Sequence, residues 1–321
     1  MKKLLTTLLI ALIALLPVAA LAEGETLNVV ALKGPTAMGM VQMMDAAPED
    51  WNFDIVADIS LVPPMLVKGE ADIAAVPANL ASVLYNNDGV DVQVLAVNTL
   101  GVLYILESGD APTVTSVEDL KGKTIYASGK GATPEYALNY ILKGNGLDPQ
   151  ADVTVEWKSE HAECLNALIN EDNAVAMLPQ PFVTTATMKA EKPLTVVLDL
   201  TKEWDKLQAD AEAPSAMITG AVVVRREYAE AHHDEVVRFM DAYAQSVAFV
   251  NEDNDAAAAL VGKFDIVPEP VAKLALPACN IVLIEGDELK AKLGGYLAAL
   301  CAEDPAAVGG QVPGDDFYFT K

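Results

Sequence analysis

The chain has 321 residues, of which 21 are Lys or Arg and 46 are Asp or Glu, giving a formal net charge of −25 at pH 7. Such a negative field repels phosphate backbones and anionic lipids, which argues against a protein that binds nucleic acid or a membrane surface. A chain of about 300 residues is long enough for two lobes, each with its own core.

The N-terminal segment predicts a signal peptide over residues 1–22. Lys2 and Lys3 precede an apolar run, Pro17 breaks that run, and Ala20-Leu21-Ala22 fits the small-x-small pattern of signal-peptidase sites. The run is short for a membrane span, although an N-terminal anchor is the alternative reading. The mature chain would begin at Glu23 and be exported to the periplasm or the extracellular space, without a cysteine at the cleavage site to carry a lipid.

Short apolar strands then alternate with amphipathic helices, which is typical of α/β architecture. A capping box of Ser116 and Asp119 predicts a helical turn, and apolar residues recur at helical spacing between 236 and 247. In chain order, strands are predicted at residues 27–32, 53–56, 72–76, 92–97, 101–106, 124–127 and 218–224, and helices at 37–44, 63–67, 79–85 and 134–143.

The chain also contains an internal echo. Residues 67–77 and 169–179 share a helix end, a turn, a buried strand and a final proline. Gly34-Pro35-Thr36-Ala37 and Gly131-Ala132-Thr133-Pro134 each follow a strand and open a helix. The echo predicts two similar lobes, although chance recurrence of α/β junctions is the alternative.

Two motifs carry a family resemblance. The segment from Ser116 to Lys123 resembles the S-x-x-D-L-K-G-K segment that opens the second lobe of type II periplasmic binding proteins, and Gly69 to Ala74 resembles their G-x-x-D-hydrophobic-A strand. The segment from Leu32 to Ala37 looks like the first ligand loop of the nitrate/sulfonate/taurine-type branch. The resemblance covers roughly residues 26–290.

The resemblance implies an α/β, two-lobed periplasmic-binding-protein type II fold whose lobes are joined by two crossing strands. Lobe one would comprise residues 26–104 plus 219–321, and lobe two residues 105–218. It further implies a monomeric substrate-binding protein that closes over a small-molecule ligand by hinge motion and delivers it to the membrane subunits of an ABC importer. Alternatively, the protein would be a sensory ligand-binding subunit whose partner is a receptor instead of an importer.

The pattern gives little support for catalysis, for a cofactor or for a metal site. His232 and His233 are adjacent and therefore point about 100° apart on a helix, unlike a two-ligand i, i+4 pair. The segment from Glu160 to Glu163 around His161 is interpreted as a solvated helix start. A thiamine-pyrimidine synthase or precursor-binding protein of the same fold is the main rival. Cys164, Cys279 and Cys301 are interpreted as free thiols, with a Cys279–Cys301 disulfide as the alternative.

Ligand contacts are expected where strands end and helices begin, because the free N–H groups there favour anions and other acceptors. Helix capping is the competing explanation for each such side chain. Lys33 and Lys130, in two of these loops, suggest an anionic ligand. The predicted ligand-binding residues are Lys33, Gly34, Pro35, Thr36, Asn79, Thr99, Ser128, Gly129, Thr133 and Gln180.

Overall fold

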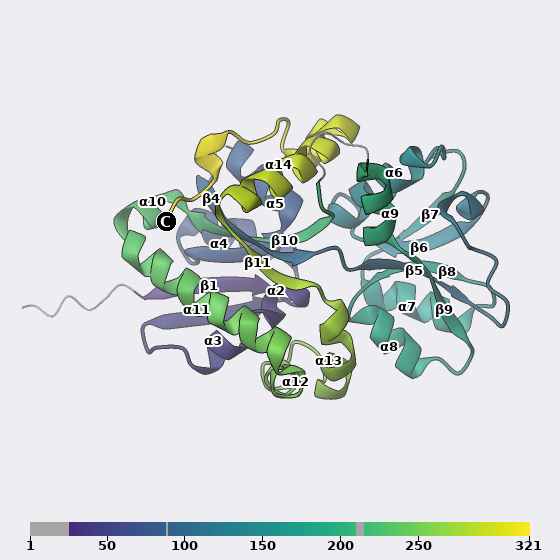
Figure 1. Ribbon diagram of the computed structural model, residues 1–321, viewed down its shortest axis with the longest axis horizontal. Helices are drawn as coiled ribbons and strands as arrows, with labels where there is room; N and C mark the ends of the chain where they lie inside the picture. The colour runs from purple at the N-terminus through teal and green to yellow at the C-terminus, as the bar shows by residue number, and fades with distance from the viewer. Residues whose placement is uncertain (1–25, 88, 210–214) are drawn as a thin grey trace, which may run out of the picture.

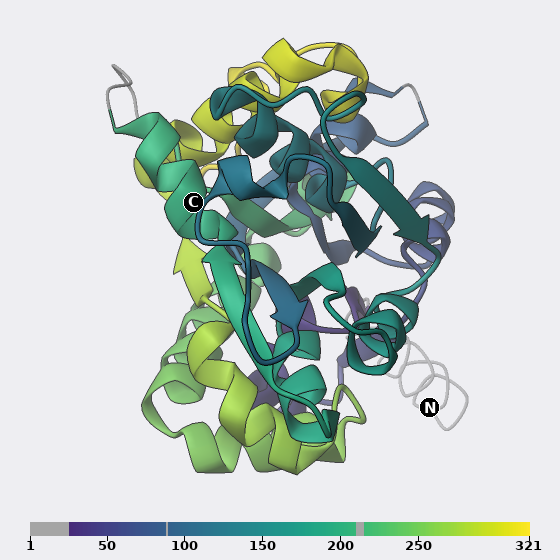
Figure 2. The same ribbon diagram turned by 90° about the vertical axis from the view of Figure 1, so that its right-hand side faces the viewer.

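A computed structural model describes residues 26–87, 89–209 and 215–321. The predicted signal peptide lies outside the described residues. Figure 1 shows two lobes side by side, each built on one sheet with helices on both of its faces. Figure 2 views the molecule from the second-lobe end, with that lobe toward the viewer. The two-lobed α/β fold expected from the sequence is therefore confirmed.

The first lobe is built on a six-stranded sheet. Strands β1, β2 and β3 are parallel, whereas β10 runs antiparallel to both β3 and β4, and β11 antiparallel to β4. The strand order is β11 (Ile281–Ile284), β4 (Val92–Leu100), β10 (Ile218–Arg225), β3 (Ile73–Pro77), β1 (Leu27–Leu32) and β2 (Trp51–Val56).

The second lobe is built on a five-stranded sheet. Strand β6 is parallel to β7 and β8, whereas β5 is antiparallel to β8 and β9. The strand order is β7 (Thr154–Lys158), β6 (Thr124–Ser128), β8 (Val175–Pro179), β5 (Leu103–Ser108) and β9 (Leu194–Asp199). Reading both sheets in the same direction, β10, β3, β1 and β2 correspond to β5, β8, β6 and β7. The two prolines of the sequence echo therefore end equivalent strands, β3 and β8.

Helices bury their apolar faces against these sheets. In the first lobe, α4, α5 and α14 cover one face and α3, α11 and α12 the other (Figure 1). In the second lobe, α6 and α9 lie opposite α7 and α8. The helices of the first lobe are α2 (Pro35–Met38), α3 (Val41–Asp45), α4 (Val62–Lys68), α5 (Ala78–Asn86), α10 (Arg226–Ala231), α11 (His233–Glu252), α12 (Asn254–Lys263), α13 (Glu269–Ala275) and α14 (Gly286–Glu303). Those of the second are α6 (Thr133–Gly144), α7 (His161–Asn170), α8 (Phe182–Lys189) and α9 (Leu200–Gln208). Short 3-10 turns lie at Ile59–Leu61, Val117–Leu120, Leu276–Ala278, Pro305–Val308 and Asp315–Phe317.

Most predicted elements appear near their expected positions, and the Ser116–Asp119 capping box is present. The helix predicted over residues 37–44 is wrong in one respect, because it is divided into α2 and α3 around Gly39 and Met40. A Cβ on Gly39 would lie 3.0 Å from Ile281 Cγ2 and 3.3 Å from the Tyr243 hydroxyl oxygen. Packing against β11 and α11, which come much later in the chain, therefore accompanies the break.

The chain passes between the sheets at Gly101 and Val102, from the end of β4 to the start of β5. It returns between α9 and β10. The lobes also touch away from these crossings, because α14 contacts α6 and α13 contacts α8. The exact bounds of the lobes stay a prediction.

Candidate functional site

Three helices of the second lobe begin beside one another. Strands β7, β6 and β8 are neighbours in the sheet, and α7, α6 and α8 follow their carboxyl ends. Ser128 ends β6, His161 begins α7 and Phe182 begins α8. The Ser128 hydroxyl is hydrogen-bonded to His161 Nδ1, and the His161 ring lies 5.1 Å from the Phe182 ring. Side chains from three separate elements therefore meet at the carboxyl ends of these strands.

His161 is the main residue that the sequence analysis misjudged. Its flanking glutamates suggested a solvated helix start, but the imidazole is partly buried between Ser128 and Phe182. Burial lowers the pKa of His161 to about 4, because the charged imidazolium loses its hydration. At neutral pH the site therefore holds a neutral ring, which offers hydrogen bonding without a net charge.

Acidification should destabilise the protein through His161. The unfolded imidazole takes up its proton near pH 6.5, whereas the folded one does so only near pH 4. The stability due to the neutral ring is therefore complete above about pH 6.5 and is lost as the pH falls toward 4, by up to ~3 kcal/mol. Urea unfolding at pH 7.5 and 5.0 should show about 2 kcal/mol of this loss, because pH 5.0 is still about one unit above the folded pKa.

The matched variants for that experiment are His161→Gln and His233→Gln. The first should flatten the pH dependence between pH 7.5 and 5.0. The second removes an imidazole that is 48% exposed and serves as the control for the loss of a histidine. An unchanged slope in His161→Gln would show that other groups control acid stability.

Two predicted residues of the first lobe, Thr36 and Thr99, belong to one hydrogen-bond network. The Thr36 hydroxyl donates to the Leu32 carbonyl at 2.6 Å, and Asn98 Nδ2 donates to the Thr36 carbonyl at 3.2 Å. The Thr99 hydroxyl donates to Asn98 Oδ1, also at 3.2 Å. A Cβ on Gly220 would lie 2.3 Å from Asn98 Oδ1, so only glycine leaves room for this network. Asn98, inside a strand pattern, was not singled out from the sequence.

Two further predicted residues bond to each other across the lobes. The Thr133 hydroxyl, at the start of α6, donates to Asn79 Oδ1 at 3.1 Å, near the start of α5. Asn79 Nδ2 in turn donates to the Ala307 carbonyl at 3.2 Å. Both side chains are almost completely buried. The starts of α5 and α6 therefore meet at the interface between the lobes.

The remaining predicted residues are one buried glutamine, two glycines, one proline and two exposed lysines. Gln180 is buried, and its Oε1 accepts a hydrogen bond from the Thr184 hydroxyl at 2.9 Å. Gly34 and Gly129 have positive φ values of 135° and 85°, and Pro35 begins α2. Lys33 is exposed and lies 3.3 Å from Asp265. Lys130 is exposed and lines an outer groove beside β7. The structure thus does not bring the two lysines together.

Within the described ranges, no three His, Cys, Asp or Glu residues are close enough to hold a metal ion. Cys164, Cys279 and Cys301 are free thiols, so the alternative of a Cys279–Cys301 disulfide is wrong. Burial raises the pKa of Cys279 to about 12, which makes its thiol unreactive near neutral pH. No helix among the described residues has the length and apolar character needed to cross a bilayer.

Solved structures of similar fold include ABC-transporter proteins. One from Parabacteroides distasonis is 21% identical, with a TM-score of 0.77, covering 92% of this chain and 99% of that chain. The periplasmic aliphatic sulphonate binding protein SsuA of Escherichia coli is 18% identical, with a TM-score of 0.72 and coverages of 93% and 95%. The periplasmic nitrate-binding protein NrtA of Synechocystis PCC 6803 is 11% identical, with a TM-score of 0.60 and coverages of 92% and 84%.

No curated protein matched the sequence. The model of one family, described as the periplasmic substrate-binding protein of phosphonate ABC transporters, matches residues 42–266. This match covers well over half of the chain, and it agrees with the fold of the solved structures. The chain therefore belongs to this family and is the substrate-binding component of an ABC transporter.

Proposed function

We propose that the protein captures a small oxyanion between its two lobes outside the cytoplasm, without catalysis, and presents it to the membrane subunits of an importer. The observation that carries this proposal is the meeting of Ser128, at the end of β6, with His161 and Phe182, which begin α7 and α8. Export would follow from the predicted signal peptide, and the protein would act as a monomer.

The physical reason for an oxyanion lies in the helix ends. The first N–H groups of α6, α7 and α8 lack intrahelical partners, and the helix dipoles place partial positive charge there. The Ser128 hydroxyl and the neutral His161 ring offer further hydrogen bonds at the carboxyl ends of the same strands. The names of the family and of two structural neighbours, which refer to phosphonate, sulphonate and nitrate, support the same chemical class.

The opposite lobe would complete the site. Thr36, Thr99 and Asn98 lie in one network of the first lobe, and the Asn79–Thr133 bond holds the two lobes in contact beside it. The Thr36 hydroxyl already donates to Leu32, so it would contact a ligand only as an acceptor. We infer that the backbone of the segment from Gly34 to Thr36, rather than this hydroxyl, faces an anion.

Calorimetric titration tests the proposal. Mature protein, freed of bound solute by unfolding and refolding, is titrated with ethanesulfonate, methylphosphonate, nitrate and an uncharged aminopyrimidine. We expect one of the oxyanions to bind and, at 100 times its Kd, to stabilise the fold by about 2.7 kcal/mol. Ser128→Ala should weaken that binding by about 1.5–3 kcal/mol, as expected for a hydrogen bond to a charged group.

Ser60→Ala, at an exposed turn of the first lobe, is the control and should bind as the wild type does. Binding of the aminopyrimidine alone would replace the oxyanion assignment with a neutral heterocycle. Equal affinity in Ser128→Ala and the wild type would remove Ser128 from the site.

A further inference from the structure

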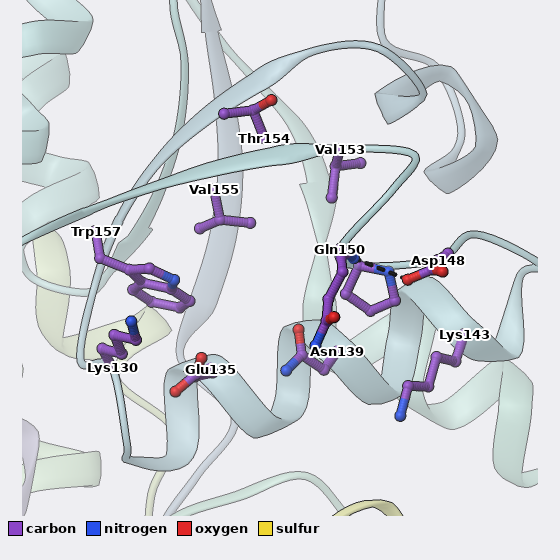
Figure 3. A pocket seen from close by; sticks show the side chains of 11 residues that line it. Lys130, Glu135, Asn139, Lys143, Asp148, Gln150, Val153, Thr154, Val155 and Trp157 are labelled. Atoms are coloured by element: carbon purple, nitrogen blue, oxygen red, sulfur yellow. Dashed lines mark hydrogen bonds between the residues drawn. The ribbon is translucent and has the colours of Figure 1, made fainter.

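A groove of about 500 Å3 runs along the second lobe, and Lys130, at one of its ends, belongs to the loop that joins Ser128 to α6. Figure 3 shows it between helix α6 and strand β7, with Trp157 and Lys130 toward one end and Asp148 toward the other. The groove is lined by Lys130, Glu135, Asn139, Lys143, Asp148, Pro149, Gln150, Val153, Thr154, Val155 and Trp157.

Strand β7 forms one wall of this groove and is the last strand of its sheet. Thr154 N–H donates to the Lys123 carbonyl at 3.0 Å, so Thr154 faces β6. In a parallel pair, every second residue bonds to the neighbour and the residues between them face away. The N–H and C=O groups of Val155 and Trp157 therefore point to the open edge, where they can pair with another strand.

The side chains of β7 leave this edge accessible from the groove. Val155 and Trp157 line the groove, whereas Glu156 and Lys158 alternate to the other face of the sheet. Glu156 and Lys158 also pair with each other at 2.6 Å. The charges that commonly protect an edge strand are thus turned away from the groove and neutralise each other.

The charged groups around the groove indicate which segment fits. Lys143 is paired with Glu303, and Glu135 accepts a hydrogen bond from the Gly131 N–H at 2.6 Å. Among the described residues, Lys130 has no ion-pair partner. It lies near Trp157 in Figure 3, at the carboxyl end of β7. Glu135 and Asp148 of the groove have no ion-pair partner among the described residues either, so a carboxylate of a bound segment is favoured only where it can reach Lys130.

We propose that the groove binds an extended, acid-bearing segment of a partner protein, which adds a strand to β7 and places a carboxylate against Lys130. The backbone of Val155 and Trp157 would supply the hydrogen bonds, and the groove would hold alternate side chains of the segment. This interaction goes beyond solute capture, because it uses the backbone of β7 and the groove beside α6, whereas the Ser128–His161 bond joins the end of β6 to the start of α7.

Amide hydrogen exchange followed by NMR tests the proposal on the mature protein. The probe is an acetylated hexapeptide of alternating valine and threonine with glutamate at its carboxyl end. Exchange of the Val155 and Trp157 amides should slow at least about tenfold at saturating peptide. Strand β9, the other edge of the same sheet, is the internal control, and its amides should exchange as before.

Charge reversal gives the second measurement. Lys130→Glu should no longer bind the acidic peptide and should instead bind the same peptide with lysine in place of glutamate. Circular dichroism and the melting temperature check that the variant is folded. The proposal is overturned by equal protection of β7 and β9, by no protection at millimolar peptide, or by the same peptide preference in both proteins. Self-association in sedimentation that protects β7 without peptide would also overturn it, because the occupant would then be a second copy of the chain.

Discussion

Replacing Trp204 with alanine should lower the free energy of unfolding by about 3–5 kcal/mol and loosen the contact between the lobes. Trp204 lies on α9 of the second lobe and is completely buried. Its ring lies 4.3 Å from the Tyr140 ring of α6 and 5.3 Å from the Tyr296 ring of α14, which belongs to the first lobe. Truncation therefore removes packing within one lobe and between both.

Small-angle scattering and urea unfolding of the same samples separate these two effects. Trp204→Ala should increase the radius of gyration of the ligand-free protein, because the apolar seam between α9 and α14 is lost. Trp204→Phe keeps an aromatic ring but loses part of the buried indole together with the hydrogen bond from Nε1 to the Ser215 hydroxyl, so it should destabilise the protein less than Trp204→Ala does.

Trp51→Ala is the matched control, because Trp51 is buried among Phe53 and Phe239 within the first lobe. It should destabilise the protein without changing the radius of gyration of the folded form. If Trp204→Ala and Trp51→Ala have the same radius of gyration, the contact between α9 and α14 does not hold the lobes together.

The architecture could be predicted well from sequence because it depends on local, repeated patterns. The echo of residues 67–77 in 169–179 corresponds to strands β3 and β8, which occupy equivalent positions in the two sheets. The division at Gly39 could not be predicted, because it accompanies close contact with Ile281, which is far away in sequence.

The candidate site was predictable only where one short segment specifies it. Ser128 follows a strand and precedes a helix, so its position at the sheet edge could be expected. His161 could not be placed, because its burial depends on Ser128 and Phe182, which come from two other elements. Asn79 and Thr133 were each expected at a helix start, but local sequence carries no sign that they bond to each other across the lobes.

Gly101→Ala should strain the passage of the chain from the first lobe to the second. A Cβ at Gly101 would lie 2.1 Å from Thr201 Oγ1 and 2.6 Å from Met217 Cε. The Gly101 carbonyl accepts a hydrogen bond from Asn280 Nδ2, which ties the backbone to the first lobe and limits its adjustment. Overpacking of this kind should cost about 1–3 kcal/mol of unfolding free energy.

Thr201 provides a direct test of that cause. Its buried hydroxyl has no hydrogen-bond partner among the described residues, so Thr201→Ala alone should change stability by less than about 1 kcal/mol. Because the closest clash is with this hydroxyl, Thr201→Ala should recover part of the loss in Gly101→Ala, giving a coupling of about 1–2 kcal/mol in a double-mutant cycle. Gly89→Ala, whose Cβ would meet only Val67 at 3.9 Å, is the neutral control. Purely additive losses in the cycle would show that the strain at Gly101 comes from its backbone or from Met217 rather than from Thr201.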